Sequence, residues 1–335
     1  MSDTVPNLVS VSVTDAESAL AVLVIGESLM DVVVSSAATL EHAGGSPMNV
    51  AVGLARLGRP ARLLTRIGSD QRGAVIASHL DAAGVQLVPG SVVFGPTSTS
   101  TAILDASGAA EYEFSIDWSL EPLSELPASA VVHTGSIAAF LPPGAAQLEA
   151  LLRRAANAGA IITFDPNIRP SIIGSLEQSL GAVERIASLA TVVKLSDEDA
   201  LWLFGVLNAD EVLDRLLAMG ATLAIVTLGA SGAVIATATA RVSVPGVSVR
   251  VADTIGAGDS FMSAVVAKLA ALLERGVAAG QILDGSVFDA AVLVDIAEFA
   301  VTCAAITVTR TGANPPTMAQ ALETQALKVS AWSAN

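Results

Sequence analysis

The strongest constraint on the fold is an alternation, from residue 19 onward, of short β-branched segments with longer alanine-rich segments. The short segments have the apolar composition of strands that are buried on both faces, and the longer ones have the composition of helices. This alternation is typical of a parallel sheet that is covered by helices on both sides. We expect core strands at residues 21–25, 61–67, 131–134, 161–164, 191–195 and 223–227. We expect helices at residues 49–57, 71–83, 145–158, 176–187, 197–204, 209–219, 260–273 and 288–307.

Two regions break this rhythm. Residues 30–43 and 92–118 contain strand pairs with alternating polar side chains, which predicts a small separate layer that could act as a lid over a site. The chain shows no repeat and no linker, so we expect residues 20–330 to form a single domain. Residues 1–19 contain three acidic residues and no basic one, unlike a signal peptide, and are expected to be a disordered N-terminal extension.

Composition narrows the class of partner. The chain has 335 residues, of which 52% are hydrophobic, and a formal net charge of −15. Such a charge repels nucleic acid and anionic membranes, so we expect a small-molecule partner, no nucleic acid and no membrane. Because residues 1–19 are unlike a signal peptide, we expect a cytoplasmic location. The apolar segment at residues 288–309 contains Asp289, Asp295 and Glu298, which favours a buried helix. The single cysteine, Cys303, is expected to be a buried thiol.

The most informative motif is Asp-Thr-Ile-Gly-Ala-Gly-Asp at residues 253–259. Gly256, Ala257 and Gly258 allow a ligand to approach the backbone closely, and a helical segment follows them. The free amides and the positive dipole end of that helix would suit a phosphate. The motif therefore predicts an anion site with a carboxylate, Asp259, beside it.

A second motif, Gly44-Gly45-Ser46-Pro47-Met48-Asn49, enters another helical segment. The diglycine allows close approach, and the Asn49 amide offers both a donor and an acceptor, as a sugar hydroxyl requires. Taken alone, it could equally be a turn followed by a helix N-cap.

Several enzyme classes are excluded by missing motifs. No lysine follows a glycine, so the chain has no Walker A loop. The histidines His42, His79 and His133 are too far apart for an HExxH zinc site, and no GxGxxG follows the first expected strand. These absences argue against a P-loop enzyme, a zinc protease and an NAD-linked oxidoreductase.

Together the two motifs resemble both signatures of the PfkB (ribokinase-like) family of carbohydrate kinases, and the fructokinase-like members most of all. The first signature has Gly44-Gly45 followed by Asn49, Ala51, Gly58 and Gly68, and the second runs from Asp253 through Phe261. Weaker similarity lies at residues 26–31, 165–170, 194–199, 227–232 and 309–315, so the resemblance covers residues 20–320. It implies a ribokinase-like three-layer α/β/α sandwich with a mostly parallel central sheet and a small β-sheet lid.

The resemblance also implies catalytic roles. Asp259 would take the proton from a sugar hydroxyl that attacks the γ-phosphate of ATP, and the amides of Gly256, Ala257 and Gly258 would hold the charge of the transferred group. The structural alternative for Asp259 is N-capping of the helix. Asp31, Gly44, Gly45 and Asn49 would bind the sugar, although an Asp at a strand end is also an ordinary turn residue. Arg169 would contact a phosphate or a substrate oxygen, or else form a surface salt bridge.

On the nucleotide side, the resemblance implies binding of ATP by Lys194, Ser196, Thr227, Gly229, Gly232 and Gly258. A lone Thr-x-Gly-x-x-Gly is also found in simple strand-to-hairpin turns. Ser196 and Asp199 stand where the family commonly has an Asn-x-x-Glu pair, which leaves the Mg²⁺ role open between Glu198 and Asp199. Asp253, Ile255 and Gly312 would be candidate ligands of a monovalent cation such as K⁺.

The expected activity is ATP-dependent phosphorylation of a small neutral sugar, with fructose first. Ribose, 2-keto-3-deoxygluconate and a nucleoside stay open as substrates, and a non-catalytic sugar sensor is the alternative from another class. A sugar phosphate is disfavoured because residues 31–55 contain no Lys or Arg. Lid strands pair between subunits in several relatives, which implies a homodimer. The sequence names neither the sugar nor the hydroxyl that reacts.

Overall fold

The computed structural model describes residues 21–36, 38–104, 110–123, 125–205 and 208–332. Within them, the larger sheet has nine strands in the order β15-β14-β13-β12-β11-β10-β1-β4-β6. They are β1 (Val22–Ile25), β4 (Ala61–Leu64), β6 (Gln86–Leu87), β10 (Val131–Gly135), β11 (Ile161–Asp165), β12 (Val192–Ser196), β13 (Leu223–Thr227), β14 (Ala233–Ala236) and β15 (Arg241–Val244). All pairs from β6 to β13 are parallel, and β14 and β15 add an antiparallel edge.

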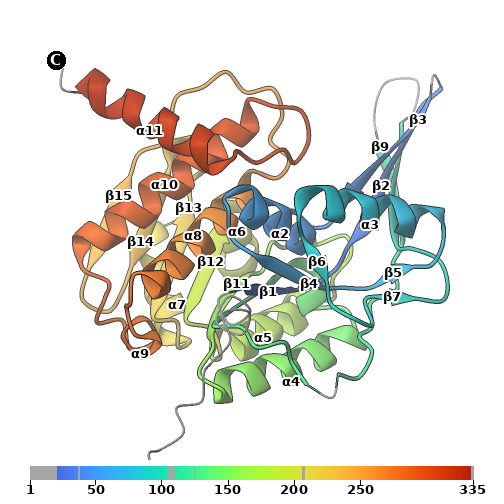
Figure 1. The fold of residues 1–335 in the computed structure, drawn as a ribbon, viewed down its shortest axis with the longest axis horizontal. Coiled ribbons are helices and arrows are strands. Elements are labelled where there is room, and N and C mark those ends of the chain that lie inside the picture. The colour runs from blue at the N-terminus through green and yellow to red at the C-terminus, as the bar shows by residue number, and fades with distance from the viewer. Residues whose placement is uncertain (1–20, 37, 105–109, 124, 206–207, 333–335) are drawn as a thin grey trace, which may run out of the picture.

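Helices cover both faces of this sheet (Figure 1). Strand β1 shows why: Val22 and Val24 point into one apolar core and Leu23 and Ile25 into the other. The first core is covered by α2 (Ser46–Arg56), α3 (Gln71–Ala83), α8 (Ala257–Glu274), α9 (Ala279–Leu283), α10 (Ala290–Val308) and α11 (Met318–Trp332). The second is covered by α4 (Gly144–Asn157), α5 (Leu176–Ala187), α6 (Asp197–Phe204) and α7 (Ala209–Ala218). The predicted α/β/α sandwich is confirmed.

A small sheet projects from the body beside α2 and α3 (Figure 1). Its strands are β2 (Leu29–Val34), β3 (Thr39–Gly44), β8 (Thr99–Leu104) and β9 (Ala110–Ser115), in the order β3-β2-β8-β9. It contains most of the two regions that were expected to leave the main sheet. The expectation for residues 1–19 concerns residues outside the described part of the chain.

Several expected boundaries were wrong, among them the start of the helix expected at residues 49–57, which begins at Ser46. The strand expected at residues 61–67 ends at Leu64, and Ile67–Gly68 forms a separate strand, β5. β5 pairs with β7 (Val92–Val93), so the beginning of the region at residues 92–118 lies outside the small sheet. The Thr65 amide donates to Ser91 Oγ at 3.2 Å, and the Gly68 amide donates to Thr97 Oγ1 at 3.0 Å. These side-chain acceptors replace the ladder of the large sheet and let the chain turn away from it.

Helix α10 has the length and apolar composition of a membrane span, but 56% of its most apolar window is buried inside the protein. It packs along α8, and both helices contribute to the same core. Cys303 lies on α10 and is fully buried, as expected. The apolar character of α10 is therefore that of a core helix.

Helices α2 and α8 approach each other closely at Gly53. A Cβ atom at Gly53 would lie 2.7 Å from the Cβ of Ser263 and closer still to its Oγ. Because the glycine lacks this atom, the two helices approach each other, and their first turns meet. The fold thus places the Gly44-to-Asn49 motif beside the motif at residues 253–259.

We predict that Gly53→Ala destabilises the protein by about 1–3 kcal/mol, because the added methyl overlaps Ser263 and outweighs the better helix propensity of alanine. The matched control is Gly280→Ala in α9, where an added Cβ meets nothing within 4 Å. This control should be neutral or stabilising by up to about 1 kcal/mol. Urea denaturation of both variants measures the effect, and equal stabilities would contradict the close packing.

Candidate active site

Asp259 lies in the first turn of α8 and is 7% exposed. The helix begins at Ala257, three residues before the expected start, because Gly256 takes a left-handed conformation with φ 77° and acts as the N-cap. A Cβ at Gly256 would lie 2.7 Å from the Cβ of Ala313, so the glycine is required for space as well as for its dihedral angle. The turn therefore presents Asp259 from a tightly packed backbone.

Three side chains converge on the Asp259 carboxylate. Ser46 Oγ donates to Oδ1 at 2.6 Å, and Asn49 Nδ2 donates to Oδ2 at 2.8 Å. Asn167 Nδ2 lies 3.5 Å from Oδ1, at the limit of a hydrogen bond. The carboxylate thus bonds to side chains of other segments, and the α8 N-cap has no side-chain hydrogen bond. The structure joins Asp259 and Asn49, two residues that the sequence placed in different motifs.

The start of α8 also offers positive potential. The amides of Ala257, Gly258 and Asp259 occupy the first turn and have no acceptor within the helix, and Ala257 makes only a long contact of 3.3 Å to the Thr254 carbonyl. Lys194 reaches the same turn from the middle of β12, and a Cβ on Gly258 would lie 3.2 Å from its Nζ. Amide groups and an ammonium group therefore meet at one point, as an anion site requires.

Lys194 is buried in an ion pair with Asp165, at 2.9 Å between Nζ and Oδ2. Burial raises the pKa of Asp165 to about 6, although the charge of Lys194 lowers it. Burial lowers the pKa of Lys194, but the charges of Asp165, Asp199 and Asp259 hold it above its usual value. The neighbouring His133 is also buried, and its burial together with the Lys194 charge lowers the pKa of the ring to about 3, so His133 is neutral. Lys194 supplies the positive charge of this group.

Glu27, at the carboxyl end of β1, forms part of the floor of the site. Its Oε2 accepts a hydrogen bond from the Ala138 amide at 3.1 Å. Its carbonyl oxygen lies so close to Gly45 that a Cβ atom at Gly45 would be only 2.6 Å from it. Burial raises the pKa of Glu27 to about 8; hydrogen bonds from Ser136 and Ala138 lower it, and the Asp259 charge raises it further. At neutral pH Glu27 is mainly a neutral acid, so it adds no full negative charge beside Asp259.

Asp31, on β2 of the small sheet, lies opposite Ser100 and His42. Partial burial raises its pKa, while the Ser100 hydrogen bond and the charges of His42 and Arg169 lower it. A Cβ at Gly44 would lie 3.0 Å from Asp31 Cγ, so this glycine makes room for the carboxylate. Arg169 donates to the Ile168 carbonyl at 3.0 Å, and it interacts electrostatically with Asp31. The structure thus brings Asp31, Gly44 and Arg169 to one side of the site.

Three of the predicted nucleotide residues lie at the end of β13 or in the loop after it: Thr227, Gly229 and Gly232. Thr227 Oγ1 lies 3.5 Å from the Leu195 carbonyl, and Thr227 pairs with Ser196 of the neighbouring strand. Gly229 and Gly232 have φ angles of 52° and 102°, and the Gly232 amide donates to the Gly229 carbonyl at 3.2 Å. This tight turn follows the carboxyl end of β13, beside Ser196, which ends β12 two residues after Lys194.

The two acids considered for Mg²⁺ differ in their surroundings. Asp199 is buried, and its two carboxylate oxygens accept from the amides of Ile168 at 2.8 Å and Ser196 at 3.2 Å. Glu198 is exposed. In the described part of the chain no cluster of three or more His, Cys, Asp or Glu side chains could hold a metal ion.

The predicted monovalent-cation residues form a closed loop. Asp253 accepts from the amides of Ile255 at 3.0 Å and Gly312 at 2.8 Å, and these bonds lower its pKa. Asp253 therefore ties the start of the α8 motif to the segment after α10.

Four residues of the site were not predicted from the sequence: Glu27, Ser46, Asp165 and Asn167. All four lie inside segments that were singled out, yet nothing local reveals their contacts. In the structure, the backbone of Asn167 is left-handed, with φ 42°, and this conformation is strained for a residue with a side chain.

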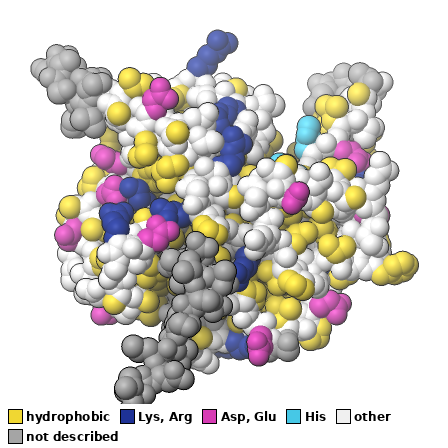
Figure 2. Space-filling view, in the orientation of Figure 1, with side chains coloured by type: hydrophobic (Ala, Val, Ile, Leu, Met, Phe, Trp, Pro, Cys, Tyr) yellow, Lys and Arg dark blue, Asp and Glu magenta, His cyan; other side chains and the backbone are white. Residues whose placement is uncertain are grey.

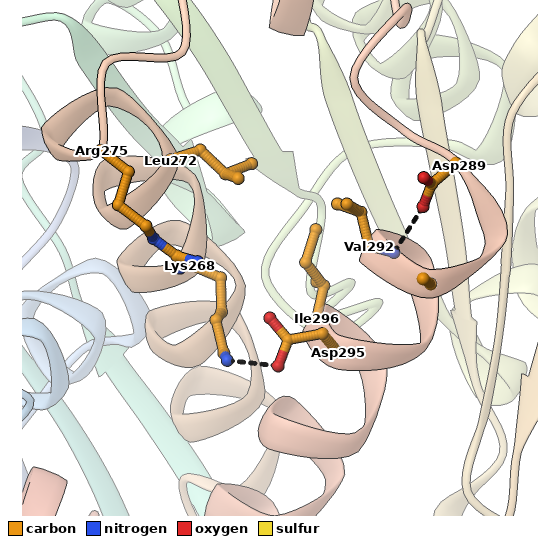
Figure 3. Close-up of a pocket in the computed structure, with 8 residues that line it drawn as sticks. Lys268, Leu272, Arg275, Asp289, Val292, Asp295 and Ile296 are labelled. Atoms are coloured by element: carbon orange, nitrogen blue, oxygen red, sulfur yellow. Dashed lines mark hydrogen bonds and ion pairs between the residues drawn. The ribbon is translucent and has the colours of Figure 1, made fainter.

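A separate hollow lies between α8 and α10, lined by apolar Leu272, Val292 and Ile296 and by charged residues (Figure 3). Charged side chains of the hollow bind other groups of the protein. Lys268 forms an ion pair with Asp295 at 2.7 Å, and Asp289 caps α10 by accepting a hydrogen bond from the Val292 amide at 2.9 Å. Basic and acidic side chains lie side by side over α8 and α10 (Figure 2). At 1.5 Å per residue, Lys268 stands about 14 Å along α8 from Asp259, so this hollow is not part of the site.

Comparison with known proteins identifies relatives of the whole chain. The family model described as "pfkB family carbohydrate kinase" matches residues 20–320. Fructokinase-2 of Solanum lycopersicum is 32% identical over 331 residues, which is 93% of this chain and 98% of that protein. The structure of a fructokinase with bound ATP from Xylella fastidiosa matches with a TM-score of 0.78 and 30% identity, covering 91% of this chain and 97% of that one. A fructokinase double mutant from Vibrio cholerae O395, in a form bound to fructose, ADP and potassium ion, matches with a TM-score of 0.76 and 28% identity over 90% and 97% of the chains.

We predict that Glu27→Gln becomes increasingly stable relative to the parent protein as the pH rises from about 4.5 to 8. The folded protein holds the Glu27 proton up to a pH of about 8, whereas an ordinary Glu releases it near 4.5, so the parent loses stability across this window. Glutamine carries no such proton, and the difference between the two proteins should grow by at most about 1.4 kcal/mol per pH unit. Urea denaturation at several pH values tests this, and a difference that does not vary between pH 5 and 8 would contradict it.

Proposed function

Because the chain belongs to the pfkB family of carbohydrate kinases and is therefore an ATP-dependent sugar kinase, we propose that its sugar substrate is fructose. The contact that carries the catalytic part of the proposal is the one between Asp259 and Asn49, which unites the two family motifs in one site. Fructokinases from a plant and a bacterium resemble it over almost their whole lengths, and this similarity supports fructose before other sugars.

In this proposal Asp259 is the general base. It is a buried carboxylate at the edge of an anion site, and it takes the proton from the sugar hydroxyl as that oxygen attacks the γ-phosphorus of ATP. Asn49 and Asp31 hold the sugar by its hydroxyl groups, with the backbone of Gly44 and Gly45 close to it. Arg169 stands at the same side and contacts a substrate oxygen.

The first turn of α8 and Lys194 stabilise the phosphoryl group during transfer. The amides of Ala257, Gly258 and Asp259 donate to its oxygens, and the Gly256 N-cap sets their direction. The ammonium of Lys194, fixed by Asp165, adds the charge that amides lack. The residues around Thr227, Gly229, Gly232 and Ser196 approach the rest of the nucleotide.

The ions follow from the same arrangement. Relatives are known in complex with ATP and with a potassium ion, which supports ATP and a metal ion here. We propose Mg²⁺ on the ATP phosphates, near the exposed Glu198, since both oxygens of Asp199 are engaged. We propose K⁺ at the loop of Asp253, Ile255 and Gly312, bound by its carbonyl oxygens.

We also propose that the small sheet is the lid of the site and the interface of a homodimer, in a cytoplasmic protein. Two strands of that sheet, β3 and β9, are its edges, and both expose large side chains: Leu40 is 55% and Tyr112 is 60% exposed. Tyr112 also stacks on Phe114, with ring centroids 6.1 Å apart. An exposed apolar sheet edge is a natural place for a second subunit. Light scattering that gives the mass of a single chain would contradict this part.

Substrate identity is tested by ADP release with a panel of fructose, ribose, 2-keto-3-deoxygluconate, a nucleoside and fructose 6-phosphate, each with and without K⁺. We expect the highest kcat/KM for fructose, poor use of the sugar phosphate, and stimulation by K⁺. Higher kcat/KM for another sugar of the panel would replace fructose and leave the kinase assignment intact. Tight sugar binding without turnover of any sugar would instead favour a sensor.

The role of Asp259 is tested by Asp259→Asn. The amide keeps the shape of the side chain and cannot accept the proton, so we expect kcat to fall by about 10²–10⁴-fold. Binding of ATP and sugar, measured by calorimetry, should change little. A variant that keeps near-normal kcat would show that another group is the base.

A further inference from the structure

Ser46 makes the shorter of the two close contacts to Asp259, yet it belongs to no role assigned so far. Its hydroxyl donates to Asp259 Oδ1 at 2.6 Å, across a sequence separation of 213 residues. The contact is partly buried, and a hydrogen bond from a hydroxyl to a carboxylate of this length is among the strong ones. The residue that supplies it is thus able to fix the orientation of the carboxylate.

Ser46 is not occupied with capping its own helix. It is the first residue of α2, whose N-cap is Gly45 and has no side-chain hydrogen bond. Serines near helix starts commonly stabilise the helix by accepting from a backbone amide. Here the hydroxyl is instead directed away from α2 and toward α8.

The backbone that carries Ser46 is held from three sides. Gly45 has φ 116° and lies against the Glu27 carbonyl, so only glycine fits there. Pro47, the next residue, packs against Gly26, where a Cβ would lie 2.6 Å from the Pro47 Cβ. Further along α2, Gly53 brings the helix against α8. A side chain of only one rotatable heavy-atom bond on this rigid backbone places its oxygen with little freedom.

The two oxygens of Asp259 have different partners. Oδ1 receives the Ser46 hydroxyl and, at 3.5 Å, the amide of Asn167. Oδ2 receives only the amide of Asn49 among the hydrogen bonds of the described residues. Asn49 is also the proposed partner of the sugar, so a bound sugar hydroxyl can take its place at Oδ2 while Oδ1 keeps its donors.

We propose that Ser46 is a positioning residue for the base: it anchors Oδ1 of Asp259 and so leaves Oδ2 as the oxygen that accepts the proton. The inference rests on the proposed role of Asp259. In the transfer step the sugar O–H bond breaks, its proton goes to Oδ2, and the sugar oxygen forms the bond to phosphorus as ADP leaves. The Ser46 hydroxyl keeps its own proton and its bond to Oδ1 throughout.

The first test is Ser46→Ala, with Ser46→Thr as the matched control that keeps the hydroxyl. We expect alanine to lower kcat by about 10- to 100-fold, because the carboxylate loses its fixed direction. KM for sugar and for ATP should stay within about twofold. Tm should fall slightly, because the lost hydrogen bond outweighs the better helix propensity of alanine. Threonine should recover most of kcat. A normal kcat for alanine, or a change in KM alone, would overturn the proposal.

A second test asks whether Ser46 acts through Asp259. In the Asp259→Asn background, adding Ser46→Ala should cause no further loss of kcat, because the group that Ser46 positions is already gone. If the losses of kcat caused by the two substitutions multiply instead, the inference is overturned and Asp259 is kept as the base. A near-normal kcat for Asp259→Asn alone would instead refute the proposed base, so the two failures are distinguishable.

Discussion

The site depends on hydrogen bonds between the first turn of α2 and a buried carboxylate in the first turn of α8. Asp259 is paired with Ser46 and Asn49, which precede it by 213 and 210 residues. Both helix starts depend on a glycine. Gly45 and Gly256 have positive φ angles, and a Cβ atom at either position would collide with neighbouring atoms. The contact at Gly53 sets the spacing of the two helices, and the sheet below sets their direction.

Electrostatics explain how a protein of net charge −15 can bind a phosphate. The carboxyl groups near Asp259 are each compensated in a different way. Glu27 stays protonated, Asp165 forms an ion pair with Lys194, and Asp199 accepts hydrogen bonds from two backbone amides. Positive potential is then concentrated at the start of α8, in helix amides and in the Lys194 ammonium. The Lys194 charge is costly to bury without Asp165, so the pair holds the ammonium in place at the turn.

The sequence predicted the sandwich, most of its strands and helices, and the pairing of two motifs in one site. Periodicity and glycine placement carry that information locally, as β1 and the loop before α8 illustrate. Other features depend on contacts that no local pattern contains. The bond from Ser46 to Asp259 exists only because α2 and α8 lie side by side, and the raised pKa of Glu27 comes from its burial in the fold. The turn from β4 into β5 depends on distant acceptors, Ser91 and Thr97.

The central claim is that Asp259 Oδ2 faces the reacting hydroxyl while Oδ1 stays bound to Ser46. The most direct measurement is a crystal structure of the protein with fructose and a non-hydrolysable ATP analogue. The account predicts a sugar hydroxyl within about 2.6–3.2 Å of Oδ2, in line with the terminal phosphorus, and the Ser46 contact to Oδ1 preserved. A complex in which the sugar hydroxyl nearest the phosphorus contacts a different base, with Asn49 still bound to Oδ2, would contradict it.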